Sequence, residues 1–301
     1  MSSAAEIMNF GSLNLDQVFR VPHLVRPGET LAARDSHTLA ELDGMMLRQG
    51  LNQSIALARA GVRVVHAGKI GPDGALLEET LREAGVDTSL ISRAGSASGR
   101  AVIQVDDASQ NSILLFPGSN REITPEEIDR AVETMGPETM LLVQNEINLV
   151  PEIIRRAKQT GHRVICNPAP CTPEVAREFP LEMIDLLVVN EVEGADLSGK
   201  EEPDEILDTL TGKFPEMAVL LTLGSRGAVY ARGGERISEP APDVTVVDTT
   251  AAGDTFIGYF LAARLRGYPV PMALRYAGTA SGIAIGRPGA APSIPAASEV
   301  F

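Results

Sequence analysis

Short, nearly continuous apolar runs recur along the chain and alternate with stretches that have helical character. The runs are residues 7–10, 62–67, 140–143, 164–166, 186–189 and 219–223. A strand that is apolar at every position has both faces buried, as in a parallel sheet covered by helices. The helix-like stretches are residues 75–84, the segment from 124 onward, 151–160, 203–214 and 256–266. This pattern predicts an α/β protein, a three-layer α/β/α sandwich around a mainly parallel central sheet.

Two regions, residues 15–42 and 99–116, depart from this alternation. Both contain apolar and polar residues in turn, which is typical of partly exposed strands. Residues 100–106 and 111–116 flank a polar turn and indicate a hairpin. We therefore expect a small β-sheet lid attached to one domain that spans residues 1–301.

Composition and charge narrow the function classes. The 26 basic and 40 acidic side chains give a net charge of −14, which disfavours a broad nucleic-acid surface. Two cysteines are too few for a disulfide framework, which indicates a reducing compartment. No apolar run approaches ~18 residues and the first ten residues lack a signal-peptide pattern. We expect a cytoplasmic protein with no membrane partner and no nucleic-acid partner.

Two nucleotide-binding motifs can be set aside. Gly194, Gly199 and Lys200 have the spacing of a phosphate-binding P-loop, but Glu201 stands where a Ser or Thr would hold Mg²⁺. The glycine fingerprint of dinucleotide-binding folds is absent.

The strongest signal for chemistry lies at residues 248–256. Three very small residues, Ala251, Ala252 and Gly253, precede Asp254 and an apolar helical stretch. Free N–H groups at a helix start bind anions, and small residues let a ligand approach them. Such a site suits phosphoryl transfer, with Asp254 accepting a proton from the attacking hydroxyl. By itself the segment favours a helix cap after a tight turn, and only the other motifs change that balance.

Short polar residues follow other apolar runs. Asn14, Asp16 and Glu146 stand where the carboxyl ends of parallel strands line a ligand crevice, and their side chains can bind sugar hydroxyls. They could equally be solvated loop residues.

Two further segments have a functional and a structural interpretation. Asn190 and Glu193 either support a phosphate or cap a helix. Thr222 and the glycines Gly224 and Gly227 form either a nucleotide-binding loop or a hairpin turn.

Taken together, the ordered motifs resemble the ribokinase branch of the PfkB family of carbohydrate and nucleoside kinases. The segments that carry the resemblance are residues 11–16, 27–30, 167–170, 190–193, 222–227, 248–256 and 287–293. They extend from about residue 7 to residue 295, nearly the whole chain.

The resemblance implies roles for individual residues at the reacting centre. Asp254 would be the catalytic base, and the backbone N–H groups of Ala252, Gly253 and Asp254 would form the anion hole. Ala251 would also belong to the catalytic site. The sugar would be bound by Asn14, Asp16, Gly50, Asn52, Glu146 and Asp254.

It also implies binding of ATP, Mg²⁺ and an activating K⁺. ATP would contact Asn190, Glu193, Thr222, Gly224, Ser225, Gly227 and Gly253, with Glu193 reaching Mg²⁺ through water. The K⁺ site would consist of Asp248, Thr250, Ala284, Arg287, Gly289 and Ser293.

One segment departs from the family pattern. Where the family has Gly-Gly-Lys-Gly-x-Asn, this chain has Leu47, Arg48 and Gln49 before Gly50. The departure is consistent with a different substrate, a loop rerouted through Gly44, or an impaired sugar site.

The resemblance implies ATP-dependent phosphorylation of a sugar hydroxymethyl group, with D-ribose converted to ribose 5-phosphate. The alternatives are a kinase for another small sugar or nucleoside, or a pseudokinase that binds a sugar or nucleotide. We expect a homodimer formed through the lid, because exposed strand edges pair with copies of themselves.

Overall fold

The computed structural model describes residues 6–38, 49–108 and 110–301. Within these ranges nine strands form one mainly parallel sheet, in which β12 and β13 at one edge are antiparallel. In spatial order the strands are β13 (Glu235–Glu239), β12 (Ala228–Arg232), β11 (Ala218–Thr222), β10 (Leu186–Asn190), β9 (Val164–Asn167), β8 (Met140–Gln144), β1 (Ile7–Phe10), β4 (Val64–Ile70) and β5 (Asp87–Arg93).

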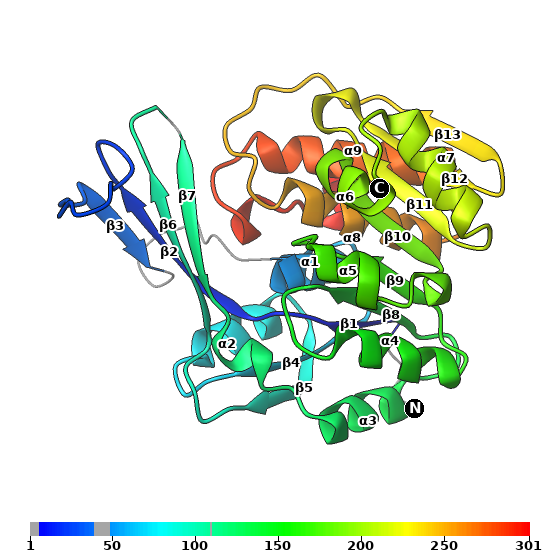
Figure 1. Cartoon of the computed structure of the whole chain (residues 1–301), viewed down its shortest axis with the longest axis horizontal. Coiled ribbons are helices and arrows are strands. Elements are labelled where there is room, and N and C mark those ends of the chain that lie inside the picture. The colour runs from blue at the N-terminus through cyan, green and yellow to red at the C-terminus, as the bar shows by residue number, and fades with distance from the viewer. Residues whose placement is uncertain (1–5, 39–48, 109) are drawn as a thin grey trace.

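Helices cover both faces of this sheet (Figure 1). The helices on one face are α1 (Gln49–Arg59), α2 (Ala75–Glu83), α8 (Ala252–Leu265) and α9 (Val270–Ile285). The helices on the other face are α3 (Pro125–Thr134), α4 (Val150–Gln159), α6 (Glu191–Ser198) and α7 (Pro203–Lys213), with the short α5 (Pro173–Glu178) beside α6. The predicted three-layer α/β/α sandwich is confirmed.

The two cores explain why the strands are apolar at every position. In β8, Met140 and Leu142 belong to the core with α1 and α8, whereas Leu141 and Val143 belong to the core with α3 and α4. Successive side chains of a strand point to opposite faces of the sheet. Because helices cover both faces here, the side chains on both faces must be apolar.

The second sheet is the predicted β-lid. Its strands, in the order β3 (Asp35–Thr38), β2 (Asn14–Arg20), β6 (Gly99–Val105) and β7 (Asn111–Phe116), project from the body of the molecule (Figure 1). β6 and β7 form the expected antiparallel hairpin, and β2 runs parallel to β6. All six residues of β7 are exposed.

Most predicted elements have the expected position, with differences at their ends. α3 begins at the predicted cap, where Thr124 and Glu127 form a capping box. The strand expected at residues 62–67 is β4, which continues beyond the expected end, through Gly68 to Ile70. A Cβ at Gly68 would lie 2.8 Å from the Gly11 carbonyl oxygen, so this glycine serves close packing and not a turn.

No helix in the described part of the chain is both long enough and apolar enough to cross a membrane.

Candidate functional site

A cavity of about 630 Å³ opens at the carboxyl edge of the central sheet. Its wall comprises the loop after β11, the segment that follows β13, and the first turn of α8 with one side of α9. The lining residues include Thr222, Gly224, Ser225, Gly227, Pro242, Val244, Thr249, Ala252, Gly253, Leu274, Gly278 and Gly282. A cavity of this size holds a nucleotide-sized ligand.

The start of α8 presents backbone N–H groups to this cavity. Ala251 precedes the helix in the left-handed conformation, with φ 60°, which side-chain-bearing residues rarely adopt. The Gly253 N–H belongs to the first helical turn, where no earlier helix carbonyl can accept it. A Cβ at Gly253 would meet nothing within 4 Å, so its surface is open to a ligand.

The structure qualifies the three-residue anion hole predicted from the sequence. The Ala252 N–H already donates to the Thr249 carbonyl oxygen at 3.3 Å. Gly253 is therefore better placed than Ala252 to donate to a phosphate.

Asp254 lies beside Gly253 and is 9% exposed. Its Oδ2 accepts a hydrogen bond from Asn52 Nδ2 at 3.1 Å, and its Oδ1 accepts one from Gln53 Nε2 at 2.9 Å. Both donors come from α1, about 200 residues earlier in the chain. The structure thus brings together two of the predicted sugar-site residues, Asn52 and Asp254. Gln53 was not among the predicted site residues, although it adjoins Asn52 in the same motif.

A second group of predicted sugar-site residues meets at the base of the lid. Asn14 Nδ2 donates to Glu146 Oε2 at 3.4 Å, and the Ser12 hydroxyl donates to the same oxygen. Asn120 Nδ2 donates a hydrogen bond to Asn14 Oδ1 at 2.8 Å, which holds the Asn14 side chain in place. Asp16 follows on β2 and is 5% exposed. Ser12 lies in the motif at residues 11–16 but was not among the predicted site residues, and Asn120 lies in none of the motifs.

Gly50 joins these two groups through a close backbone contact. A Cβ at this position would lie 2.5 Å from the Ser12 backbone nitrogen and 2.7 Å from its carbonyl oxygen. Only glycine allows α1 to approach the loop after β1 so closely. Gly44, Leu47 and Arg48 lie outside the described residues, so the departure predicted to crowd the sugar is not placed.

Asn190 and Glu193 form a capping box at the start of α6. The Glu193 N–H donates to Asn190 Oδ1 at 2.9 Å, and the Asn190 N–H donates to Glu193 Oε2 at 3.0 Å. Burial raises the pKa of the Glu193 carboxyl. The two residues do not line the 630 Å³ cavity, but Asn190 is the register partner of Thr222, which does.

The predicted nucleotide loop is also a hairpin turn. Residues 223–227 connect β11 to the antiparallel β12, and Gly227 has φ 95°. A Cβ there would lie 2.1 Å from the Glu239 carbonyl oxygen. The hairpin-turn interpretation is therefore confirmed. Thr222, Gly224, Ser225 and Gly227 also line the cavity, and their binding of a nucleotide stays a prediction.

The predicted K⁺-site residues come from two segments that hydrogen-bond each other. Asp248 Oδ1 accepts from the Thr250 N–H at 2.9 Å and from the Thr250 hydroxyl at 2.6 Å. Asp248 Oδ2 accepts from the Gly289 N–H at 3.0 Å. The Ala284 carbonyl oxygen accepts from the Arg287 N–H at 3.0 Å.

The remaining two members of that set have structural partners. The Arg287 side chain pairs with Glu299 at 2.5 Å, and the Ser293 hydroxyl donates to the Ala290 carbonyl oxygen at 2.7 Å. Among the described residues, no cluster of three or more His, Cys, Asp or Glu side chains could hold a metal ion. Any cation here would depend on backbone and hydroxyl oxygens in addition to Asp248.

Several residues that line the cavity could not be identified from motifs. The segment 239–246 has no regular structure beyond its first residue, and its sequence carries no nucleotide-binding signal. Gly278 and Gly282 lie one helical turn apart on α9 and both line the cavity. Their spacing is a sequence signal for a helix face of small residues, which leaves room for a ligand.

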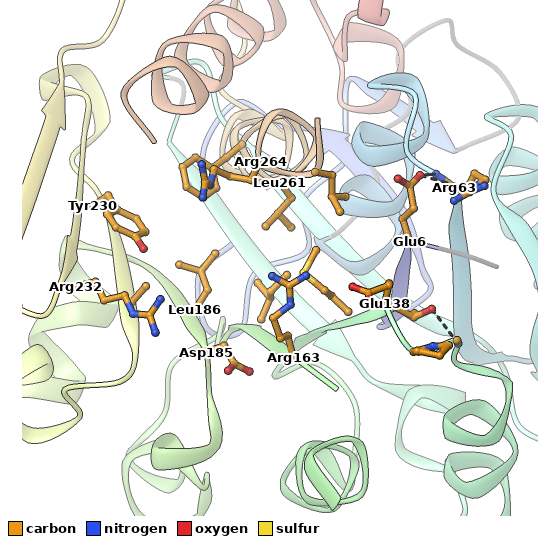
Figure 2. A pocket seen from close by; sticks show the side chains of 18 residues that line it. Glu6, Arg63, Glu138, Arg163, Asp185, Leu186, Tyr230, Arg232, Leu261 and Arg264 are labelled. Atoms are coloured by element: carbon orange, nitrogen blue, oxygen red, sulfur yellow. Dashed lines mark hydrogen bonds and ion pairs between the residues drawn. The ribbon is translucent and has the colours of Figure 1, made fainter. Parts of the chain in front are cut away.

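A larger cavity, of about 750 Å³, lies at the opposite edge of the sheet (Figure 2). Apolar side chains such as Leu186 and Leu261 line it together with charged ones, among them Arg163, Arg232 and Arg264. None of the predicted site residues lines it. The candidate site is the smaller cavity, because in open α/β sheets ligands bind at the carboxyl ends of the strands.

Comparisons with known proteins show which family the chain belongs to. The family model described as pfkB family carbohydrate kinase matches residues 49–297. A ribokinase from Haemophilus influenzae is 33% identical, over 97% of this chain and 95% of its own.

Solved structures extend the likeness to three dimensions. The crystal structure of ribokinase from Cryptococcus neoformans var. grubii in complex with ADP has a TM-score of 0.82 and 32% identity, covering 99% of both chains. The structure of Arabidopsis thaliana ribokinase complexed with ribose and ATP has a TM-score of 0.85 and 29% identity, covering 99% of this chain and 98% of that one.

Proposed function

Because the chain belongs to the PfkB family of carbohydrate kinases, we propose that it transfers the γ-phosphoryl group of ATP to the 5-hydroxyl group of D-ribose. The observation that carries the proposal is the position of Asp254. It lies between a cavity of nucleotide size and the buried polar residues of α1. The relatives bound to ADP, or to ribose and ATP, support both substrates.

In the proposed reaction the ribose 5-oxygen attacks the γ-phosphorus. A new P–O bond forms, the bond between the γ-phosphorus and the bridging oxygen breaks, and its electron pair leaves with ADP. The hydroxyl proton passes to the Asp254 carboxylate, which acts as general base. The Gly253 N–H donates to the phosphoryl oxygens while their charge develops, with smaller support from Ala252. Ala251 forms the turn that positions the N–H groups of Ala252 and Gly253.

We assign sugar binding to the two polar groups that Gly50 joins. Asn14, Asp16 and Glu146 would bind ring hydroxyls, and Asn52 would contact the sugar beside Asp254. Asn14, Asp16 and Asn52 are buried, which excludes competing water, so each of their hydrogen bonds to a hydroxyl would add to specificity.

The nucleotide would occupy the 630 Å³ cavity, with its base between the 239–246 segment and the glycine face of α9. Mg²⁺ supplies charge neutralisation on the phosphates during transfer. The donor set fits an ion held mainly by phosphate and water. Glu193 is a single carboxylate and already accepts a hydrogen bond, which suits contact through water.

The oxygen-rich junction of residues 248–250 with 284–293 fits a K⁺ ion. A single carboxylate among carbonyl and hydroxyl oxygens suits a monovalent cation better than a divalent one. The carbonyl or hydroxyl oxygens would come from Thr250, Ala284, Arg287, Gly289 and Ser293, beside the carboxylate of Asp248. A cation there would fix the segment that presents the anion hole.

We further propose one domain whose lid covers the sugar site, and a homodimer in which two lids pack together. β7 leaves Leu114 and Phe116 70% and 52% exposed, an apolar surface that a second copy would cover. The buried free thiol of Cys166 is consistent with a reducing cytoplasm.

The test is phosphoryl transfer measured by ADP release across ribose, 2-deoxyribose, fructose, adenosine and inosine. We expect the highest kcat/KM with ribose, and ATP turnover that requires the sugar. A higher kcat/KM with another acceptor would assign that substrate instead. ATP binding without transfer to any acceptor would support the pseudokinase alternative.

A further inference from the structure

A chain of buried amide side chains runs from the central sheet to Asp254. Gln53 accepts a hydrogen bond from Gln144 Nε2 through its Oε1, at 2.7 Å. Its Nε2 donates to Asp254 Oδ1 at 2.9 Å and to Asn167 Oδ1 at 3.0 Å. Gln53 and Gln144 are 0% exposed and Asn167 is 7% exposed, so water does not compete for these bonds.

The partners leave the Gln53 amide one orientation. If it were flipped, its oxygen would face the oxygens of Asn167 and Asp254, and its nitrogen would face the Gln144 amide nitrogen. All three hydrogen bonds would be lost in a buried site.

The neighbouring amides are fixed in the same way. Asn167 Nδ2 donates to the Val188 carbonyl oxygen at 3.0 Å, which turns Asn167 Oδ1 toward Gln53. Gln144 Nε2 also donates to Asn9 Oδ1 at 3.0 Å. Asn9 in turn donates to the Gly50 carbonyl oxygen at 2.7 Å. Strands β1, β8 and β9 therefore determine how the amide on α1 meets the carboxylate on α8.

We propose that Gln53 is a positioning residue for Asp254, held in a single orientation by Gln144 and Asn167. This inference rests on the proposed function, because it assigns Gln53 to the reaction that Asp254 serves. A donated N–H bond keeps the carboxylate ionised and fixes its rotation about the Cβ–Cγ bond, so that a lone pair faces the sugar hydroxyl. Gln53 itself does not touch the substrate.

Two substitutions of Gln53 separate positioning from a structural role. Gln53→Glu keeps the shape but replaces the donor with a carboxylate facing Asp254. Gln53→Leu removes the donor without adding charge. We expect each to lower kcat about 10²-fold at pH 8, since a general base contributes roughly 10²–10⁴-fold. KM for ATP should change by less than about twofold, because the nucleotide cavity is untouched.

The pH profile provides the decisive readout. As the pH falls, the carboxyl group introduced by Gln53→Glu becomes protonated and regains one donor, so the deficit of this variant relative to the unsubstituted protein should shrink. The Gln53→Leu deficit should not shrink on acidification, because the Asp254 carboxylate has lost a donor that favours its ionised form. The matched control is Ser54→Ala, also on α1, which loses buried hydrogen bonds to Asn9 and His66. It should lower thermal stability while retaining kcat within about twofold.

Crystal structures of the Gln53 variants complete the test without depending on the substrate. We expect the Asp254 carboxylate to be rotated in Gln53→Leu. An unchanged carboxylate with kcat above half of the reference value in either folded variant would overturn the inference, as would parallel pH profiles for the two variants. Absence of turnover in the unsubstituted chain would instead contradict the proposed function, and the carboxylate orientation would still decide the role of Gln53.

Discussion

At the scale of single residues, the site depends on polar side chains that are buried almost completely. Asn9, Gln53, His66 and Gln144 are each 0% exposed, and each has a hydrogen-bond partner. Hydrogen-bonded polar groups in a buried site specify one arrangement, but they make the site sensitive to any change in protonation. His66 is the titratable member of this group.

His66 makes stability depend on pH. Burial lowers its pKa from 6.5 to about 4, so the ring is neutral in the folded protein. The unfolded chain binds a proton below pH 6.5 that the folded protein rejects down to about pH 4. Stability therefore falls as the pH drops through that window, by roughly 2 kcal/mol between about pH 7.5 and pH 5.

Urea unfolding of the protein and of His66→Gln at these two pH values measures this contribution. The substituted protein should lose less free energy of unfolding on acidification, by about the same 2 kcal/mol. Equal losses in the two proteins would show that His66 is not the responsible group.

At the scale of elements, the site is formed where the ends of helices and strands from distant parts of the sequence meet. The sequence could predict the strands and the start of α8, because burial on both faces and a small-residue turn leave local patterns. Local patterns could not predict that α1 reaches Asp254, since the contacts of Asn52 and Gln53 with that residue span about 200 positions. The family resemblance placed Asn52 and Asp254 at one sugar site but did not include Gln53. The glycine face of α9 left only a weak signal, because glycines one turn apart occur for many reasons.

The glycine face of α9 predicts a defect confined to nucleotide binding. A Cβ at Gly278 would meet only Pro242 Cδ, at an ordinary 3.7 Å, so Gly278→Ala should be tolerated. A leucine there would extend into the 630 Å³ cavity. We expect Gly278→Leu to raise KM for ATP more than about tenfold, which corresponds to about 1.4 kcal/mol.

Ribose affinity measured by titration calorimetry should be nearly the same in the alanine and leucine variants, since none of the proposed sugar residues lines this cavity. If Gly278→Leu bound ATP as well as Gly278→Ala does, the nucleotide would have to lie elsewhere.

At the scale of the whole molecule, the lid is the part that projects from the body (Figure 1). The alternating pattern predicted its strands, and β7 has a run of exposed apolar residues that the body does not cover. The sequence could not predict whether a second copy of the chain covers β7. A strand that is buried only in a dimer has the same pattern of apolar and polar residues as a strand exposed in a monomer.

The lid leads to a prediction about assembly. Light scattering should give about 64 kDa for the protein, twice the 31.9 kDa of the chain. Leu114→Lys places a charge in the proposed interface and should shift the mass toward that of one chain. Met272→Lys makes the same kind of change at an exposed residue of α9 and should leave the mass unchanged. A mass of about 32 kDa for the unsubstituted protein would rule out the dimer.

The central claim is that Asp254 directs the γ-phosphoryl group of ATP to the 5-hydroxyl of ribose. The most direct measurement is ³¹P and ¹³C NMR of the product formed from [5-¹³C]ribose and ATP, by the protein and by Asp254→Asn. We predict a phosphorus–carbon coupling at C5, formed roughly 10²–10⁴-fold more slowly by the variant, which retains its fold. Phosphate on another carbon, or equal rates for the two proteins, would contradict the account.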